Sequence, residues 1–340
     1  MSKGTEEFRM KKRILLTGCA GFIGSNFVRT VAQRESECEF LIIDALTYAG
    51  RLETIAPILE KCSHIKFEKM DIRDSKSIAD LFESWQPEGV IHFAAESHVD
   101  RSIENPNIFI ETNVMGTMNL LNSSLQLFNK NSNFRFVHVS TDEVYGTLTE
   151  EDPAFSETTP IAPNSPYSAS KASSDLLVRS YFETFKLPAM ITRCSNNYGP
   201  YQFPEKLVPL MISKAKKGEP LPVYGDGRNI RDWIFVDDHN EGIWKVFSQG
   251  KAGEVYNFGG QSEKRNIEVV KEILKATGQP DDLITYVEDR KGHDWRYAID
   301  FSKAEKELGW TPSVTFEEGL KRTIDWYLSN QEWVEMVSKS

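Results

Sequence analysis

The sequence has 340 residues, 40% of them hydrophobic, and a formal net charge of −10. A chain of this length can bury a large core in one or two domains. The acidic balance argues against a general nucleic-acid binder, and no apolar run approaches the roughly 20 residues that a membrane span needs. We therefore expect neither nucleic acid nor a membrane among its partners.

Cysteine usage and the start of the chain bear on where the protein works. The four cysteines, Cys19, Cys38, Cys62 and Cys194, are scattered, without the spacing of a disulfide framework or a zinc site. The first residues are charged and lack the apolar stretch of a secretory signal. We expect a cytoplasmic protein without a bound metal.

The first half of the chain alternates short β-branched runs with helical stretches. Strands are predicted at residues 13–17, 40–45, 65–71, 90–95, 135–141 and 189–195. Helices are predicted at residues 25–33, 75–84, 109–127 and 168–185. Several strands are apolar at consecutive positions, as expected of strands covered on both faces. The alternation predicts an α/β fold with a doubly wound, parallel Rossmann sheet.

Beyond about residue 195 the pattern loosens, because prolines and glycine-rich turns interrupt it. Near the end, apolar residues return at helical spacing and predict an amphipathic closing helix; they are Phe316, Leu320, Ile324 and Tyr327. We expect a Rossmann domain over residues 1–195 that carries the catalytic residues. A smaller α/β substrate domain would occupy residues 196–340, and the chain can cross between the two more than once.

A glycine-rich turn, Gly18-Cys-Ala-Gly21-Phe-Ile-Gly24, joins the first predicted strand to the first helix. Its spacing is GxxGxxG rather than GxGxxG. Such glycines let the backbone approach a pyrophosphate, which the N–H groups of the helix N-terminus then bind. Asp44 ends the second predicted strand, where a carboxylate accepts from a ribose 2′-hydroxyl and repels a 2′-phosphate. The pattern predicts NAD rather than NADP, although the nearby Arg51 weakens that preference.

Further small and polar residues stand at the ends of the third and fourth predicted strands. Open α/β sheets bind ligands at this edge. Asp71 and Ile72 are placed to face an adenine, and Ala94 and Ala95 leave room for a cofactor. His98 follows them, and for this residue a ligand contact and a structural role are equally expected.

Tyr167 and Lys171 are four residues apart in a predicted helix and so share one face. A free phenol has a pKa of about 10 and is a poor base at neutral pH. A neighbouring ammonium, assisted by a positive nicotinamide, favours the phenolate. Such a pair can take the proton of a sugar hydroxyl while hydride leaves the same carbon.

Two adjacent carboxylates, Asp142 and Glu143, lie in the run Ser140-Thr-Asp-Glu-Val-Tyr-Gly146, directly after a predicted buried strand. Like charges in a dry pocket push two pKa values apart and can so provide one acid and one base. Which of the two has the higher pKa does not follow from sequence. Taken alone, a solvated strand end is the simpler interpretation.

Together these motifs resemble the extended short-chain dehydrogenase/reductases that act on nucleotide sugars, and among them the nucleotide-sugar 4,6-dehydratases. The resemblance covers nearly the whole chain. The matching stretches include Thr17-Gly-Cys-Ala-Gly-Phe-Ile-Gly24, Asp44-Ala-Leu-Thr-Tyr-Ala-Gly50, Tyr167-Ser-Ala-Ser-Lys171, Cys194-Ser-Asn-Asn-Tyr-Gly-Pro200 and Arg231-Asp-Trp233.

The resemblance implies two sets of binding residues. NAD is expected to contact Gly18, Gly21, Phe22, Ile23, Gly24, Asp44, Leu46, Thr47, Asp71, Ile72, Ala94, Ala95, Ser97, Thr112, Tyr167, Lys171 and Asn197. The nucleotide sugar is expected to contact His98, Thr141, Asn196, Lys206, Leu207, Pro222, Tyr224, Arg231, Asn266, Arg290 and His293. Among these, Lys206 and Arg231 are chemically suited to a diphosphate. A homodimer through the helices at residues 109–127 and 168–185 is also implied.

The implied reaction explains the paired acids. Tyr167, helped by Thr141, would take the proton of the C4 hydroxyl as hydride passes from C4 to NAD. Glu143 would then remove the C5 proton, and Asp142 would protonate the departing C6 hydroxyl before hydride returns to C6. The result is a redox-neutral loss of water, a lyase reaction, with dTDP-glucose as the favoured substrate.

Three alternatives stay open. A dehydratase of UDP-N-acetylglucosamine would keep every catalytic residue and differ only in base and C2 recognition. A nucleotide-sugar 4-epimerase needs Tyr167 and Lys171 but no acid–base pair. A non-catalytic NAD-binding scaffold would keep the fold, although the intact catalytic set argues against it.

The chain departs from the family pattern at a few positions. Cys19 replaces a usual Gly, which is tolerable if the position needs no positive φ. Arg51 and Lys291 replace a usual Asn and Pro and bear on the choice of sugar nucleotide, and Trp333 stands alone where a Trp pair is usual.

Overall fold

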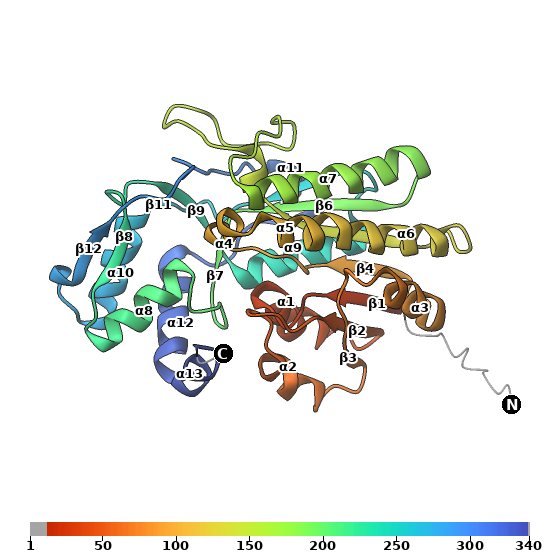
Figure 1. Cartoon of the computed structure of the whole chain (residues 1–340), viewed down its shortest axis with the longest axis horizontal. Helices are drawn as coiled ribbons and strands as arrows, with labels where there is room; N and C mark the ends of the chain where they lie inside the picture. Colours follow the sequence, from red (N-terminus) through yellow and green to blue (C-terminus); the bar gives the residue numbers. More distant parts are fainter. Residues whose placement is uncertain (1–11, 339–340) are drawn as a thin grey trace, which may run out of the picture.

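The computed structural model describes residues 12–338, so the start of the chain, where no secretory signal is expected, lies outside it. Its centre is a sheet of seven parallel strands in the order β10-β6-β5-β4-β1-β2-β3 (Figure 1). The strands are β1 (Lys12–Thr17), β2 (Cys38–Asp44), β3 (Ile65–Lys69), β4 (Gly89–His92), β5 (Arg135–Thr141), β6 (Ala189–Cys194) and β10 (Val255–Phe258). The predicted doubly wound Rossmann sheet is confirmed.

Helices cover both faces of this sheet. One face carries α1 (Phe22–Phe27), η1 (Val28–Ala32), α2 (Leu52–Leu59), α9 (Val236–Gln249) and α11 (Ser302–Leu308). The other carries α3 (Ser75–Trp85), α6 (Thr117–Phe128) and α7 (Pro166–Phe185). Three short elements, α4 (Val99–Glu104), α5 (Pro106–Phe109) and η2 (Ile110–Gly116), lead into α6. The 3-10 turn η3 (Asp142–Tyr145) follows β5 directly.

A smaller lobe lies at the left of Figure 1, beyond the carboxyl ends of the central strands. It contains a three-stranded sheet, β11-β9-β7, and a two-stranded sheet, β12-β8. Its strands are β7 (Asn196–Tyr198), β8 (Leu221–Tyr224), β9 (Ile230–Phe235), β11 (Glu263–Arg265) and β12 (Ile284–Val287). Its helices are α8 (Leu207–Lys217), α10 (Asn266–Thr277), η4 (Asp281–Leu283), α12 (Phe316–Ser329) and α13 (Gln331–Ser338).

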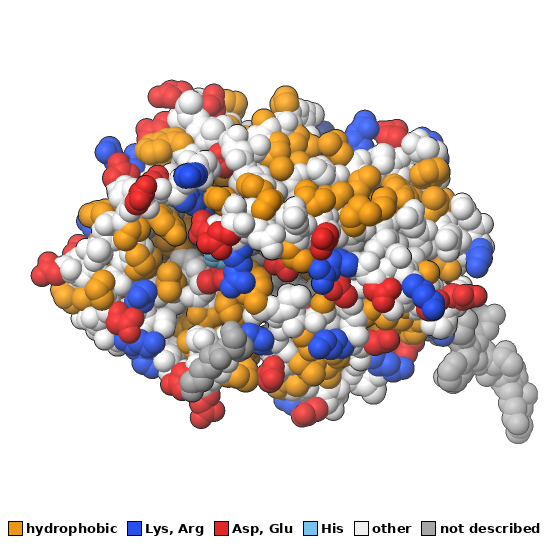
Figure 2. All heavy atoms as spheres, viewed as in Figure 1, with side chains coloured by type: hydrophobic (Ala, Val, Ile, Leu, Met, Phe, Trp, Pro, Cys, Tyr) orange, Lys and Arg blue, Asp and Glu red, His pale blue; other side chains and the backbone are white. Residues whose placement is uncertain are grey.

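Part of the surface is apolar. Figure 2 shows hydrophobic side chains gathered over α6 and α7. Large exposed apolar residues of α4, η2 and α7 are Ile103, Ile110, Met115, Leu176 and Phe185. None of the helices within residues 12–338 combines the length and the apolarity needed to cross a bilayer.

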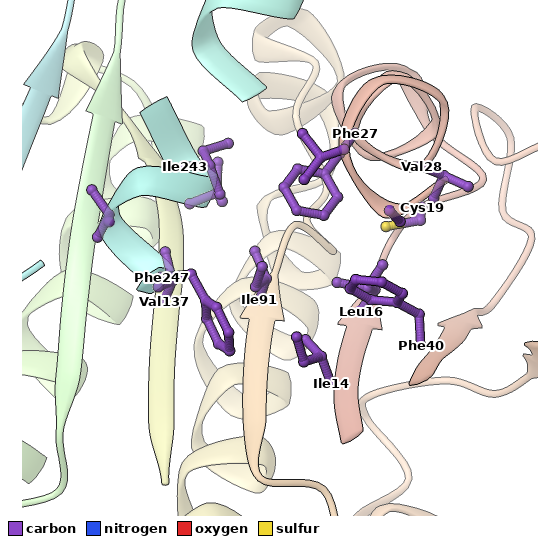
Figure 3. Close-up of a cluster of buried hydrophobic side chains, with 14 of the residues drawn as sticks. Ile14, Leu16, Cys19, Phe27, Val28, Phe40, Ile91, Val137, Ile243 and Phe247 are labelled. Atoms are coloured by element: carbon purple, nitrogen blue, oxygen red, sulfur yellow. The ribbon is translucent and has the colours of Figure 1, made fainter. Parts of the chain in front are cut away.

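The core is built by strict alternation along the strands. Ile14 and Leu16 of β1 pack on the side of Phe27 and Phe247, as Figure 3 shows, while Leu15 between them faces the opposite helices. Successive side chains of a strand point to opposite faces, so the consecutive apolar residues Ile14, Leu15 and Leu16 contribute to two cores from one strand.

The C-terminal half returns to the central sheet. β10 pairs with β6, and Phe247 of α9 packs in the core beneath β1. Residues beyond 195 therefore complete the cofactor-side sheet, and the division at residue 195 stays a prediction. The single helix expected over residues 109–127 is instead α5, π-helical η2 and α6.

Candidate active site

A cleft of about 330 Å³ runs along the carboxyl ends of the central strands, where the small lobe meets the sheet. The glycine-rich turn and Asp44 line one end, while Thr141, Glu143 and Lys206 line the other. This is the edge at which open α/β sheets bind ligands, because the chain reverses direction there and leaves a crevice.

The glycine-rich turn is close-packed. Gly18 has a φ of +73°, and a Cβ on it would lie 2.5 Å from the backbone of Ala94. A Cβ on Gly24 would lie 2.7 Å from Cys19 Cα. Gly21 then caps α1 without a side-chain hydrogen bond, which leaves N–H groups of the first turn facing the cleft. This cradle fits the phosphates of a dinucleotide.

Cys19 causes no strain at this turn. It does not have a positive φ, and its side chain is fully buried beside Leu16 and Phe40 (Figure 3). The substitution for glycine therefore fills the core and leaves the cradle open.

Asp44 is fixed by its own backbone neighbours. Its Oδ2 accepts a hydrogen bond from Ala20 N at 2.9 Å, and its Oδ1 accepts one from Leu46 N at 2.8 Å. Burial raises the pKa of the carboxyl, while these two donors lower it. Leu46 has a φ of +54° and lies outside the cleft lining, so its visible contact is with Asp44 rather than with the cleft.

The other expected cofactor residues line this same cleft. They are Gly18, Gly21, Phe22, Ile23, Gly24, Asp44, Thr47, Asp71, Ile72, Ala94, Ala95, Ser97, Thr112, Tyr167, Lys171 and Asn197. Arg51, which weakened the preference for NAD, lies outside the lining, while Asp44 lies in it. The Asp44 carboxylate can accept from a ribose diol and repels a 2′-phosphate, while Arg73, paired with Asp71, also lines this cleft.

Thr141, Asp142 and Glu143 meet at the end of β5. The Thr141 hydroxyl caps η3 by accepting from Glu143 N at 3.3 Å, and it lies at the same distance from Asp142 Oδ1. Asp142 is 2% exposed, and its Oδ2 has no hydrogen-bond partner among the described residues. A tight turn thus places two carboxyl groups at one cleft wall.

The two carboxyl groups differ in electrostatic surroundings. Burial and the neighbouring Glu143 raise the pKa of Asp142 well above its usual value. Burial also raises the pKa of Glu143, but the charges of Arg290, Lys206 and Arg231 oppose that shift. Asp142 is therefore the group that keeps a proton, and Glu143 is the one more easily ionised.

Tyr167 and Lys171 stand on the first turns of α7, across from Thr141. Burial and then Glu143 raise the pKa of Tyr167, while a hydrogen bond with Thr141 lowers it. Burial lowers the pKa of Lys171 to about 8, and its Nζ donates to the Val139 carbonyl at 2.8 Å. The polypeptide alone thus does not depress the phenol pKa as the sequence analysis expected.

The expected substrate residues fall into two groups. Thr141, Asn196 and Lys206 line the cleft itself. The others lie outside its lining, on α4, α8, β8, β9, α10 and the loop after β12; they are His98, Leu207, Pro222, Tyr224, Arg231, Asn266, Arg290 and His293. Tyr224 and His293 meet edge to face at 6.3 Å. Their binding roles stay predictions.

Arg231 has its guanidinium engaged by the protein. It donates to the carbonyls of Ile230, Trp295 and Asp294, and it lies 4.4 Å from the Tyr297 ring centroid. Its charge still acts on Glu143. Arg290, by contrast, has a buried Nε with no hydrogen-bond partner in residues 12–338, so it has a donor to offer a ligand.

Three residues that the sequence analysis did not single out, Tyr48, Arg101 and Glu205, cluster with His98 beside the cleft. The Tyr48 hydroxyl donates to Glu205 Oε1 at 3.0 Å, and Arg101 lies 3.6 Å from the Tyr48 ring centroid. Glu205 Oε2 is 3.6 Å from Arg101 and 3.7 Å from His98. The charge of Glu205 was the available signal in the sequence, but its partners come from distant segments of the chain.

Comparison with known proteins agrees with this geometry. The model of a family described as GDP-mannose 4,6 dehydratase matches residues 15–323. The chain is 55% identical to the dTDP-glucose 4,6-dehydratase of Xanthomonas campestris pv. campestris, over 95% of each chain. The crystal structure of DesIV, a dTDP-glucose 4,6-dehydratase from Streptomyces venezuelae solved with NAD bound, superposes with a TM-score of 0.90 at 45% identity, covering 96% of this chain and 99% of that one.

A different activity shares the fold. The UDP-glucose 4-epimerase of Thermus thermophilus, in complex with NAD, superposes with a TM-score of 0.85 at 29% identity, covering 94% of this chain and 99% of that one. The fold alone therefore does not separate dehydration from epimerisation, and the residues at the cleft wall must do so.

Proposed function

The chain belongs to the GDP-mannose 4,6 dehydratase family, and from this premise we propose that it is an NAD-dependent dTDP-glucose 4,6-dehydratase. The observation that best supports this proposal is the carboxyl pair at the end of β5. Asp142 is buried, and Glu143 lies beside it in the cleft that Tyr167 also lines. An epimerase needs no such pair. The product would be dTDP-4-keto-6-deoxyglucose and water.

The proposed chemistry begins at the sugar C4 hydroxyl. Tyr167 takes its proton, and the Thr141 hydroxyl lowers the pKa of the phenol. A bound NAD would supply the hydride acceptor for C4 and the hydride donor for C6. Lys171 lines the same cleft, and its ammonium would favour the phenolate.

Elimination of water then uses the two carboxyl groups in opposite protonation states. Glu143 acts as the base for the C5 proton, which the C4 ketone acidifies, because Arg290, Lys206 and Arg231 favour its ionised form. Asp142 acts as the acid for the C6 hydroxyl, because burial beside Glu143 keeps it protonated.

The test incubates the purified protein with dTDP-glucose and, in a separate reaction, with UDP-N-acetylglucosamine. Mass spectrometry then measures whether each sugar nucleotide loses the mass of one water molecule. Loss of water from dTDP-glucose is the expected result. Loss only from UDP-N-acetylglucosamine would replace the substrate, and a C4 epimer without loss of water would overturn the dehydratase assignment.

We further propose a cytoplasmic homodimer. The four cysteines are free and buried, as is usual in a reducing compartment. Ile110 of η2 and Leu176 of α7 are large exposed apolar residues. Figure 2 shows hydrophobic side chains gathered over α6 and α7, as is common at a protein–protein interface.

A further inference from the structure

Behind the cleft lies a buried polar network that the reaction described above does not use. Asp175, one helical turn after Lys171 on α7, is 1% exposed. Its Oδ2 accepts from Arg193 Nε on β6 at 2.8 Å, and its Oδ1 lies 3.5 Å from His138 Nε2 on β5. His138 Nε2 is in turn 3.4 Å from Lys171 Nζ. The imidazole thus lies between the ammonium and the carboxylate.

The imidazole in this network is neutral. His138 is completely buried, and burial together with the charge of Lys171 lowers its pKa well below the usual value. Its Nδ1 and Asp175 Oδ1 both have no hydrogen-bond partner among the described residues. Nε2 lies 3.1 Å from Ser174 Oγ and 3.4 Å from Lys171 Nζ, so a neutral ring separates the ammonium from the carboxylate and adds no charge of its own.

Among the titratable groups of residues 12–338 that surround Lys171, only one is negatively charged. From β6, Cys194 is buried, and burial raises the pKa of its thiol, so it is neutral. From β4, His92 is buried, and burial and Lys171 lower its pKa, so it is neutral as well. Tyr167 on α7 carries its proton until reaction. Asp175 is therefore the carboxylate whose charge acts on the ammonium.

Arg193 is the direct partner of this carboxylate. A buried carboxylate without a partner is costly, because desolvation disfavours the charged form. The Arg193 guanidinium pairs with Asp175 and lies 4.7 Å from the Tyr145 ring centroid, so the pair is held from both sides.

We propose that Asp175, with Arg193, is a positioning residue for Lys171: this buried ion pair holds a fixed negative charge beneath the ammonium and so keeps Lys171 protonated while Tyr167 gives up its proton. The proposal rests on the proposed function and deepens it. It extends the Tyr167–Lys171 pair by a third and a fourth residue that touch neither substrate nor cofactor.

The direction of the effect follows from the charges. Burial lowers the pKa of Lys171 to about 8, and the charge of Asp175 opposes that shift. Removing this charge lets Lys171 lose its proton at lower pH, so the activity that depends on the ammonium declines earlier on the basic side. Nearby opposite charges shift a pKa by about 1 unit or more.

The experiment measures kcat/KM for the nucleotide sugar from roughly pH 6 to 10, a range that brackets the lowered Lys171 pKa of about 8, in wild type and Asp175→Asn. The variant should lose activity on the basic side at a pH about one unit lower than wild type. Asp175→Glu keeps the charge and should restore most of the wild-type profile.

Asp238→Asn is the matched control. Asp238 is also buried and accepts hydrogen bonds from Ser313 N at 2.9 Å and from Val314 N at 2.9 Å, but it faces the small lobe rather than Lys171. It should lose thermal stability and keep the wild-type pH profile. A purely structural role of Asp175 would give the same result for both variants.

If Asp175→Asn leaves an unpaired Arg193 and does not fold, the double variant Asp175→Asn with Arg193→Met replaces the pair together, which buried ion pairs often tolerate. In this double variant, the fall of kcat/KM on the basic side should move to lower pH by the same amount. A folded variant whose activity falls at the wild-type pH overturns the proposal. Wild-type protein without any dehydratase activity would instead overturn the proposed function, so the two failures are distinguishable.

Discussion

The Thr141 hydroxyl and the Asp142 carboxyl lie 3.3 Å apart at the end of β5, where a tight turn brings Glu143 N to the same hydroxyl. Thr141 therefore caps the turn and also contacts the Asp142 carboxyl. This local geometry places both carboxyl groups at one cleft wall, with Asp142 only 2% exposed.

Replacing Glu143 and replacing Asp142 should block different steps of the reaction. Glu143→Gln should abolish exchange of the C5 hydrogen with solvent, because it removes the base, while oxidation at C4 survives. Asp142→Asn should retain C5 exchange and lose release of water by roughly 10²-fold or more, the usual size of a general-acid effect. Incubation in D₂O with mass spectrometry of the recovered sugar measures both. Wild-type deuterium uptake in Glu143→Gln would remove it as the base.

Asp44 should determine both the affinity for NAD and the preference for NAD over NADP. Asp44→Asn removes the charge that a ribose hydroxyl would bind, and a hydrogen bond to a charged group is worth about 1.5–3 kcal/mol, so the Kd for NAD should rise by about tenfold or more. Binding of NADP should weaken less, because the repulsion of its 2′-phosphate is also lost. Calorimetric titration of the cofactor-free protein measures both.

The control for this substitution is Glu39→Gln on the same strand, β2. The Glu39 carboxylate lies 3.1 Å from Lys66 Nζ and does not line the cleft. Its loss should therefore leave the affinities for NAD and for NADP unchanged. Equal NAD affinity in wild type and Asp44→Asn would contradict the assigned role of Asp44.

The sequence could predict those parts of the site that depend on neighbouring residues. The turn from Gly18 to Gly24 and the end of β5 are local, because a strand, a tight turn and a helix start follow one another in the chain. The buried network around Lys171 was not predictable in this way. His138, Asp175 and Arg193 become neighbours only because β5 and β6 pair and α7 packs over them.

Which of Asp142 and Glu143 has the higher pKa was likewise not predictable from the sequence. Adjacency of Asp142 and Glu143 shows that their pKa values must separate, but not which one rises. That depends on Arg231 from β9 and Arg290 from the loop after β12, whose charges act on Glu143. In the same way, the looser pattern beyond residue 195 concealed β10, whose position at the edge of the sheet is a long-range pairing.

Gly18 and Gly278 offer a test of the phosphate cradle. Both have a φ near +70°, but a Cβ on Gly278 meets open space, whereas one on Gly18 would lie 2.5 Å from Ala94. Gly278→Ala should cost about 1–2 kcal/mol of unfolding free energy for the left-handed backbone alone. Gly18→Ala should cost more and also weaken NAD binding. Chemical denaturation and NAD titration distinguish the two; equal losses in both would show that close packing at the turn is unimportant.

The apolar surface on α7 should hold the dimer together. Leu176 is 56% exposed, and a charge placed there would have to be buried in an interface. Leu176→Lys should shift the mass measured by light scattering after gel filtration from dimer to monomer. Leu328→Lys, at a position 37% exposed on α12, should stay dimeric. A monomeric wild type, or a dimeric Leu176→Lys, would contradict the proposed interface.

His239 should make stability depend on pH. It is completely buried on α9, its Nδ1 lies 3.0 Å from Asn197 Oδ1, and burial lowers its pKa to about 3. The unfolded chain binds a proton at the ordinary pKa of about 6.5, so the folded state is favoured above that value and loses stability as the pH falls from about 6.5 to 3. At pH 5 this one group should account for roughly 2 kcal/mol of lost stability.

His239→Gln should therefore reduce the difference in unfolding free energy between pH 7 and pH 5 by roughly 2 kcal/mol, even though it lowers stability at pH 7. Phe258→Leu is the matched control, because the Phe258 ring lies 6.0 Å from the imidazole centroid and cannot titrate. It should lower stability equally at both pH values. Urea denaturation at the two pH values measures both variants, and an unchanged pH dependence in His239→Gln would show that this histidine does not drive acid unfolding.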